Sequence, residues 1–230
     1  MLLSVYFGSS EHKLSNMNLS LKFFIAVYAL LSLFFSGILP IQAGDPTPPA
    51  SPLDTYWNGA GDTPGMTYYR QSGGYLRFTQ YPVRVYLLAG DAWQSVLETA
   101  LQQLQTVLPV QQTSNLFEAD IFIQLLSDER FENQTGCDVQ HEDACSVMLP
   151  IGNPDSHHFR VLSRIWIRRN TGLPPLHVML HELLHALGLL IHSPYPDDVL
   201  YNGSDAASIA LSSRDRATLE FLYTQPAIGE

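Results

Sequence analysis

The segment HELLH at residues 181–185 contains two histidines four positions apart, with a glutamate directly after the first histidine. On a helix, side chains at positions i and i+4 lie on one face about one turn apart, so both imidazoles can reach the same ion. Histidine pairs with this spacing are typical ligands of zinc, which prefers tetrahedral sites. The segment therefore predicts a zinc site on a helix, with His181 and His185 as two of its ligands.

Glu182 is placed to act on a water molecule at such a metal. It lies about 100° around the helix from His181, where its carboxylate can reach the water without being a ligand. Zinc lowers the pKa of bound water to about 7 and polarises a carbonyl group. The pattern predicts hydrolysis by metal-activated water, with Glu182 as general base and no covalent intermediate.

A third protein ligand is expected just beyond the helix. Gly188 follows His185 by three residues, and glycine readily adopts the positive φ that ends a helix. The chain can then turn back and bring His192 to the metal. The fourth position of a catalytic zinc site is left for water.

Other interpretations of these residues stay open. The HELLH pattern can occur by chance on a buried helix, and other side chains could be the third ligand: Asp197, Asp198 or His177. His177 lies one turn before His181, a position more typical of a residue that packs beside a ligand. His157 and His158 lie in a polar segment that we interpret as a surface loop, with a second, structural zinc as the alternative.

Regular elements must position this site. β-branched and apolar runs predict strands at 83–88, 119–126 and 160–168, and helical spacing predicts helices from Trp93 to Val107, at 176–190 and at 213–224. Pro174 and Pro175 suit the start of the middle helix, and Ser212 with Asp215 resembles a capping box. This order predicts an α+β or mixed α/β fold, with a twisted sheet backed by helices.

The longer segment HALGLLIH completes a pattern that resembles the metzincin zinc endopeptidases, and their matrixin-like branch in particular. Their pattern is H-E-x-x-H-x-x-G-x-x-H, and the last histidine of this chain comes one residue late. The resemblance implies Zn²⁺ as the cofactor, His181 and His185 as ligands and Glu182 as the base. It implies His192 as the third ligand if the turn after Gly188 takes up the extra residue.

A second resemblance lies in the segment DVLY at residues 198–201, which is similar to the metzincin turn that places a methionine under the metal. Leu200 stands where that methionine is expected, and leucine for methionine nearly conserves volume. The resemblance implies that Leu200 and Tyr201 border the pocket for the substrate side chain after the scissile bond. The segment 211–219 also looks matrixin-like.

The resemblance, which covers residues 82–224, implies a zincin-like (metzincin) catalytic domain. Its expected parts are a mostly parallel twisted sheet, a long first helix, an active-site helix and a C-terminal helix. In metzincins the substrate adds as an extended strand to a sheet edge. We expect the strand at 160–168, or the loop before it, to be that edge. Cysteine does not occur before Cys137, so a pro-segment cysteine that caps the zinc is not expected.

The first part of the chain predicts export. Residues 23–39 are apolar, Lys22 precedes them and Ala43 offers a cleavage site, as in a secretory signal. The alternative is an uncleaved membrane tether through residues 23–41. Residues 1–43 are thus a signal peptide or anchor, 44–75 a Pro/Gly-rich linker and lead-in, and 76–230 the catalytic domain. Both interpretations place the domain outside the cytoplasm.

The two cysteines, Cys137 and Cys145, enclose seven residues. In an exported chain they are expected to form a disulfide. Closing so short a loop contributes roughly 2–3 kcal/mol in the chain-entropy model. A Cys/His metal site that uses His141 is the alternative.

Composition narrows the function further. The 230 residues carry 22 acidic and 12 basic side chains, a net charge of −10 that argues against a nucleic-acid partner. A hydrophobic content of 46% excludes a disordered chain. The expected function is that of a monomeric, exported zinc endopeptidase acting on proteins or peptides. The alternative is a catalytically inactive exported domain of the same fold, with structural zinc or none.

Overall fold

The computed structural model describes residues 68–69, 74–88, 91–134, 143–153, 158–190, 192–203 and 206–227. Contacts divide the chain into two units, Met1–Gly44 and Asp45–Glu230, and all described residues belong to the second. Among the described residues, no helix has the length and apolar character needed to cross a membrane. The predicted signal or anchor and most of the predicted linker lie outside the described ranges.

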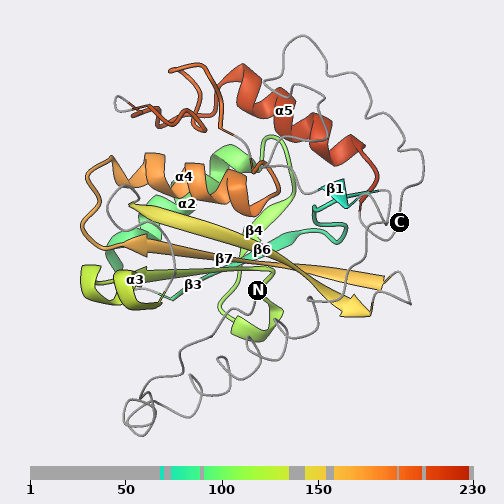
Figure 1. Ribbon diagram of the computed structural model, residues 1–230, viewed down its shortest axis with the longest axis horizontal. Coiled ribbons are helices and arrows are strands. Elements are labelled where there is room, and N and C mark those ends of the chain that lie inside the picture. Colours follow the sequence, from blue (N-terminus) through green and yellow to red (C-terminus); the bar gives the residue numbers. More distant parts are fainter. Residues whose placement is uncertain are drawn as a thin grey trace, which may run out of the picture. The chain divides into compact units, whose positions relative to one another are not determined.

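Five strands form the main sheet, in the spatial order β4-β3-β5-β7-β6 (Figure 1). They are β3 (Val83–Leu88), β4 (Val110–Gln112), β5 (Ile121–Leu126), β6 (Ala144–Asn153) and β7 (His158–Arg168). All neighbouring pairs are parallel except β6 with β7, which is antiparallel. The expected α+β fold with a mostly parallel sheet is therefore confirmed.

The helices in the described part are α2 (Gln94–Leu104), α3 (Asp128–Gln134), α4 (Pro175–Ala186) and α5 (Ser213–Thr224), with short 3-10 turns η1 (Asp91–Trp93) and η2 (Leu116–Glu118). Helix α4 contacts α2, β6 and β7, and Figure 1 shows α2 and α4 along one side of the sheet. Strand residues alternate between faces, so one face of each central strand joins the apolar core with these helices. Buried examples are Val85, Ile123 and Ile165 from the strands and Leu97 and Leu183 from the helices.

Strand β7 is not a sheet edge, contrary to the expectation for residues 160–168. It pairs with β5 on one side and with β6 on the other. Among the described strands, the outer strand at this end of the sheet is β6. The sequence patterns did not reveal β6 because its buried positions, such as Ala144 and Met148, are interrupted by polar residues and a proline. Any strand added at this end of the sheet must therefore pair with β6.

Helix α4 ends earlier than the expected residue 190, because the chain leaves the helix at Gly188. Gly188 has φ +112°, and its N–H donates to the carbonyl of His185 at 2.9 Å. The N–H of Leu189 donates to the carbonyl of Leu184 at 3.1 Å, which completes a Schellman C-cap. The apolar residues after the cap still pack into the core, which explains why the hydrophobic pattern runs on past the helix end.

The remaining elements join the two ends of the described domain. β1 (Tyr68–Tyr69) and β2 (Gly74–Tyr75) form a small antiparallel pair. The N–H of Tyr75 donates to the carbonyl of Pro226 at 2.8 Å, and Tyr75 forms a parallel bridge with Ala227. The expected capping box of α5 is confirmed, since Ser212 and Asp215 each accept a hydrogen bond from the other's backbone N–H.

Candidate metal centre

Three histidines bring their metal-binding nitrogens together at the end of α4. The nitrogens of His181, His185 and His192 all lie within 4.8 Å of one another. The Nε2 atom of His185 is 3.0 Å from Nε2 of His181 and 3.3 Å from Nε2 of His192. A tetrahedral zinc with Zn–N bonds near 2.0–2.1 Å needs its nitrogens about 3.3–3.4 Å apart. The donor set therefore fits zinc in both type and spacing.

Backbone carbonyls orient two of these rings. Nδ1 of His181 is 2.9 Å from the carbonyl oxygen of Val199, and Nδ1 of His185 is 2.6 Å from that of Leu189. Since a carbonyl only accepts hydrogen bonds, each Nδ1 carries the proton and each Nε2 presents its lone pair. Lone pairs that face one another repel, and a cation between them removes this repulsion.

The surroundings keep the imidazoles neutral. Burial, and next the charge of neighbouring His185, lowers the pKa of His181 to about 2. Burial also lowers the pKa of His185 to about 4 and that of His192 below its ordinary value. Neutral imidazole is the form that binds a metal ion, so these histidines are in the metal-binding form at neutral pH.

Glu182 lies on α4 directly after His181 and is only 5% exposed. Glutamate is seldom this buried in a protein interior, because removing its charge from water is costly unless the carboxylate is paired. A buried carboxylate on the residue directly after a metal-binding histidine suits proton transfer at a metal-bound water.

The turn after α4 brings His192 to the other two histidines although it comes one residue late. The Schellman cap at Gly188 reverses the chain, and Leu189 meanwhile supplies the carbonyl that orients His185. Ile191 lies outside the described residues. The structure thus assembles the histidines that the sequence singled out.

The other candidate ligands do not belong to this group of three histidines. Nδ1 of His177 is 2.8 Å from the carbonyl oxygen of Ser208, and its ring centroid is 5.7 Å from that of His181. Asp198 is fully buried and pairs with Arg214, and Asp197 is exposed. Within the described part of the chain, the group of converging ligand atoms consists of His181, His185 and His192.

The segment that resembles the metzincin turn lies beside the site. Leu200 is fully buried in the core, and its carbonyl accepts a 2.9 Å hydrogen bond from the N–H of Ser193. Tyr201 is half-buried and forms a parallel bridge with Ser193. Whether Leu200 and Tyr201 border a substrate pocket stays a prediction.

The predicted disulfide partners are only partly within the described residues. Cys145 lies in β6, and no cysteine among the described residues is free. Cys137, His141 and His157 lie outside these ranges, so the pairing of the two cysteines stays a prediction. His158 is the first residue of β7.

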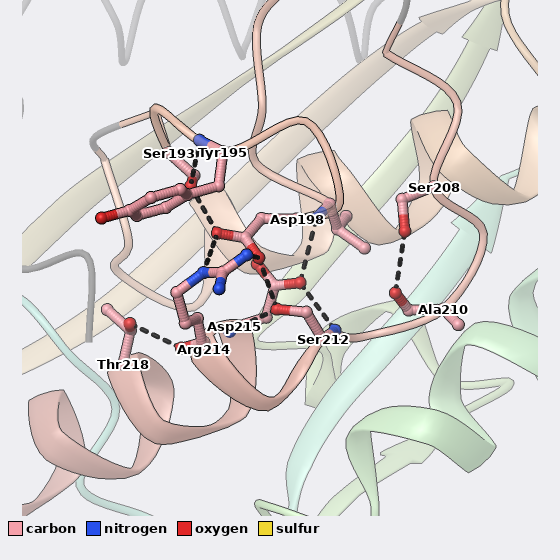
Figure 2. Close-up of polar contacts among 10 residues, drawn as sticks. Ser193, Tyr195, Asp198, Ser208, Ala210, Ser212, Arg214, Asp215 and Thr218 are labelled. Carbon is pink, nitrogen blue, oxygen red and sulfur yellow. Dashed lines mark hydrogen bonds and ion pairs between the residues drawn. The ribbon is translucent and has the colours of Figure 1, made fainter. Parts of the chain in front are cut away.

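Sequence reasoning missed an ion pair next to the histidines. Asp198 Oδ1 lies 2.9 Å from a terminal guanidinium nitrogen of Arg214 on α5, as Figure 2 shows. The residues are 16 positions apart, a separation that no helical or strand period relates. The sequence named Asp198 as a possible metal ligand, but it gave no sign that Asp198 pairs with Arg214.

Comparison with curated proteins gave no match. A family model for matrixins, which are peptidases, matches residues 75–224. This range runs from β2 to the end of α5 and includes every strand of the main sheet and the three histidines. Because the match covers more than half of the 230 residues, the chain belongs to the matrixin family.

Proposed function

We propose that this matrixin is an exported zinc-dependent endopeptidase that hydrolyses peptide bonds with a metal-activated water. The observation that carries the proposal is that metal-binding nitrogens of three histidines converge within 4.8 Å. The buried residue Glu182 directly follows the first of these histidines on α4. Matrixins are zinc peptidases, and peptidases act on proteins or peptides. The donor set of this chain fits the ion that the family uses.

Each residue would have a defined role. His181, His185 and His192 would hold Zn²⁺ through Nε2, and zinc, when bound, polarises a carbonyl group and lowers the pKa of water. Glu182 would accept a proton from the attacking water and later donate it to the leaving amine. The carbonyls of Val199 and Leu189 would keep two of the ligand rings in the correct tautomer.

Among the described strands, β6 is the outer strand at one end of the sheet, and this edge supports a peptide substrate. The N–H of Arg168 donates to the carbonyl of Asp143, and bonded and non-bonded pairs alternate along antiparallel strands. Every second residue of β6 therefore directs its backbone N–H and C=O groups away from β7. These are residues 144, 146, 148, 150 and 152. An extended substrate can pair with these groups, except that Pro150 has no N–H to donate.

This edge lies level with the histidines. Ser163, which pairs with Met148 across the β6–β7 ladder, donates its hydroxyl to the carbonyl of Ala186 at 2.8 Å. Ala186 directly follows His185 on α4. A substrate strand paired with β6 near Met148 would therefore run beside the end of α4 that carries the metal site.

The proposal of export rests on residues 1–43, in which an apolar run follows a basic residue and precedes small residues. A disulfide between Cys137 and Cys145 would suit the oxidising conditions outside the cytoplasm. A retained apolar run would instead tether the domain to the outer face of the membrane.

The experiment that tests the function uses the full chain, expressed with its N-terminal segment and purified after export. We expect about one zinc per chain, cleavage within a mixed peptide library, loss of cleavage with a chelator and recovery on adding zinc. Zinc bound without cleavage of any peptide or protein would instead support the inactive-domain alternative. Cleavage that persists in the metal-free protein would contradict the mechanism.

A further inference from the structure

We propose that Asp198 and Arg214 are positioning residues of the metal site, because their ion pair fixes the turn 193–201, which contacts two of the three histidine ligands. The catalytic consequence rests on the proposed function, whereas the consequence for metal binding does not. Figure 2 shows the cluster, in which the turn meets the first residues of α5.

The carboxylate of Asp198 is fully buried and accepts hydrogen bonds at both oxygens. Oδ1 accepts from Ser212 Oγ at 2.7 Å and from a terminal guanidinium nitrogen of Arg214 at 2.9 Å. Oδ2 accepts from Arg214 Nε at 3.0 Å and from Ser193 Oγ at 2.5 Å. Arg214 therefore grips the carboxylate with two nitrogens, the most directional form of ion pair between side chains.

The turn connects this pair to His192. Ser193 directly follows His192, and its hydroxyl donates to Asp198 while its N–H donates to the carbonyl of Leu200 at 2.9 Å. These two bonds hold the backbone on one side of His192. A shift of Asp198 would therefore be passed on to the ligand through one peptide unit.

The same turn connects the pair to His181. Val199 directly follows Asp198, and its carbonyl oxygen lies 2.9 Å from Nδ1 of His181. The N–H of Val199 donates to Oδ2 of Asp215 at 2.9 Å, so the peptide units around Val199 are held from α5 as well. The direction of the His181 ring thus depends on how firmly residues 198 and 199 are held.

Arg214 also contacts an aromatic ring. Its guanidinium carbon lies over the Tyr195 ring, 4.2 Å from the ring centroid, so the cation contacts this ring as well as the carboxylate of Asp198. The Arg214 side chain is 31% exposed, whereas that of Asp198 is 0% exposed. Truncating the arginine would leave a buried carboxylate without its counter-charge, and the turn would have to move to solvate it.

Loss of this support should weaken zinc binding. Replacing residues that orient metal ligands typically lowers metal affinity about 10- to 100-fold. We expect Arg214→Ala to raise the Kd for zinc in the full chain by about this factor, and Arg214→Lys to fall between it and the wild type. Zinc affinity is measured by competition with a chromophoric chelator. The visible spectrum of the Co²⁺-substituted protein reports the ligand geometry, and in Arg214→Ala it should change.

Arg216→Ala is the matched control. Arg216 lies one half-turn further along α5, and its side chain donates to the hydroxyl of Thr106 rather than to the turn. The Arg216→Ala variant removes an arginine from the same helix but should leave zinc affinity and the Co²⁺ spectrum unchanged. An equal loss in Arg216→Ala would mean that loosening of α5 in general is responsible, which would overturn the proposal.

Rescue by a small cation separates positioning from folding. Because Arg214 is partly exposed, guanidinium ion should enter the space left in Arg214→Ala and restore zinc affinity. It is added at concentrations too low to unfold the protein. Urea, which has a similar shape but no charge, should not restore zinc affinity. If Arg214→Ala does not fold, Arg214→Lys decides the question by the same measurements. Wild-type zinc affinity and Co²⁺ spectra in the folded variant would overturn the proposal, as would failure of rescue.

The kinetic readout depends on cleavage activity. If the wild type cleaves peptides, Arg214→Lys should lower kcat with KM little changed, since the pair orients ligands and does not touch the substrate. If the wild type cleaves none, the proposed function fails, but the zinc and Co²⁺ measurements still decide the role of the pair.

Discussion

Gly188 passes so close to Leu76 that a side chain at position 188 has no room. A Cβ atom on Gly188 would lie 2.7 Å from the carbonyl oxygen of Leu76 and 2.9 Å from Cδ2 of Leu222. The φ of +112° is also one that residues with side chains rarely adopt. The glycine thus lets the chain pass between two other segments on its way from α4 to His192.

Gly188→Ala should therefore destabilise the protein by roughly 1–3 kcal/mol and weaken zinc binding, because the strain moves the turn that leads to His192. Chemical unfolding and a zinc titration measure the two effects. Gly172→Ala is the control, since a Cβ there would meet Asp143 at 3.5 Å, an ordinary contact. Equal stability of the two variants would contradict the argument.

Glu182→Gln should abolish most of the cleavage while leaving zinc in place. The amide keeps the shape of the side chain but cannot take up a proton, and general-base catalysis contributes about 10²- to 10⁴-fold to rate. Zinc content and kcat/KM are measured on the same preparation. Glu220→Gln, at an exposed position of α5, is the control. Undiminished cleavage by Glu182→Gln would exclude this residue as the base.

His192→Ala should raise the Kd for zinc by more than about 100-fold, because it removes a ligand rather than a residue that orients one. The comparison variant is His177→Ala, which loses a histidine near His181 whose ring bonds to Ser208 instead. It should weaken zinc binding much less. If the two variants bind zinc equally well, the third ligand is another residue.

The metal-free protein should lose stability as the pH falls. Folding lowers the pKa of His181 and of His185, the latter from 6.5 to about 4. Between pH 6.5 and about 4 the unfolded chain therefore binds more protons than the folded protein. Stability is then fully present above about pH 6.5 and decreases as the pH falls toward about 4. Melting temperatures in the presence of a chelator measure this decrease. His181→Leu should flatten the dependence, and a melting temperature that rises on acidification would have the wrong sign.

Leu200→Met should change the free energy of unfolding by less than about 1.5 kcal/mol, because leucine and methionine have similar volumes. Leu200→Ala should cost about 2–5 kcal/mol, since Leu200 is fully buried in the core. Chemical unfolding of the zinc-loaded proteins gives both values. A methionine variant as unstable as the alanine variant would show that this position requires the shape of leucine.

The sequence predicted those parts of the site that depend on local spacing. His181 and His185 are one helical turn apart, and Ser212 and Asp215 form a capping box within one turn, so each pair can be recognised without knowing the rest of the fold. Gly188 after the helix pointed to His192 as a third ligand, with other side chains as alternatives, and the family resemblance then supported His192. Of the fold, the sheet backed by helices followed from the order of strands and helices, and its mostly parallel arrangement from the family resemblance.

The remaining features depend on contacts between distant segments. The edge strand β6 has no regular alternation, and its place beyond β7 is set by pairing rather than by composition. The bond from Val199 to His181 and the ion pair of Asp198 with Arg214 join separate elements, and no periodicity relates their positions. The helix predicted from the sequence was longer than α4 because the apolar residues after Gly188 are buried in the turn and continue the hydrophobic pattern.

The hydrogen bond between Tyr75 and Pro226 holds the start of β2 next to the segment that follows α5, so the chain enters and leaves this part of the domain at neighbouring positions. A linker of a few residues could join Ala227 to Tyr75, and new termini could be opened in a distant surface loop without crossing the sheet. Anything fused before β2 and after α5 would emerge side by side. Because its two ends are close together, the domain is suited to insertion into a loop of another protein with little distortion of that protein.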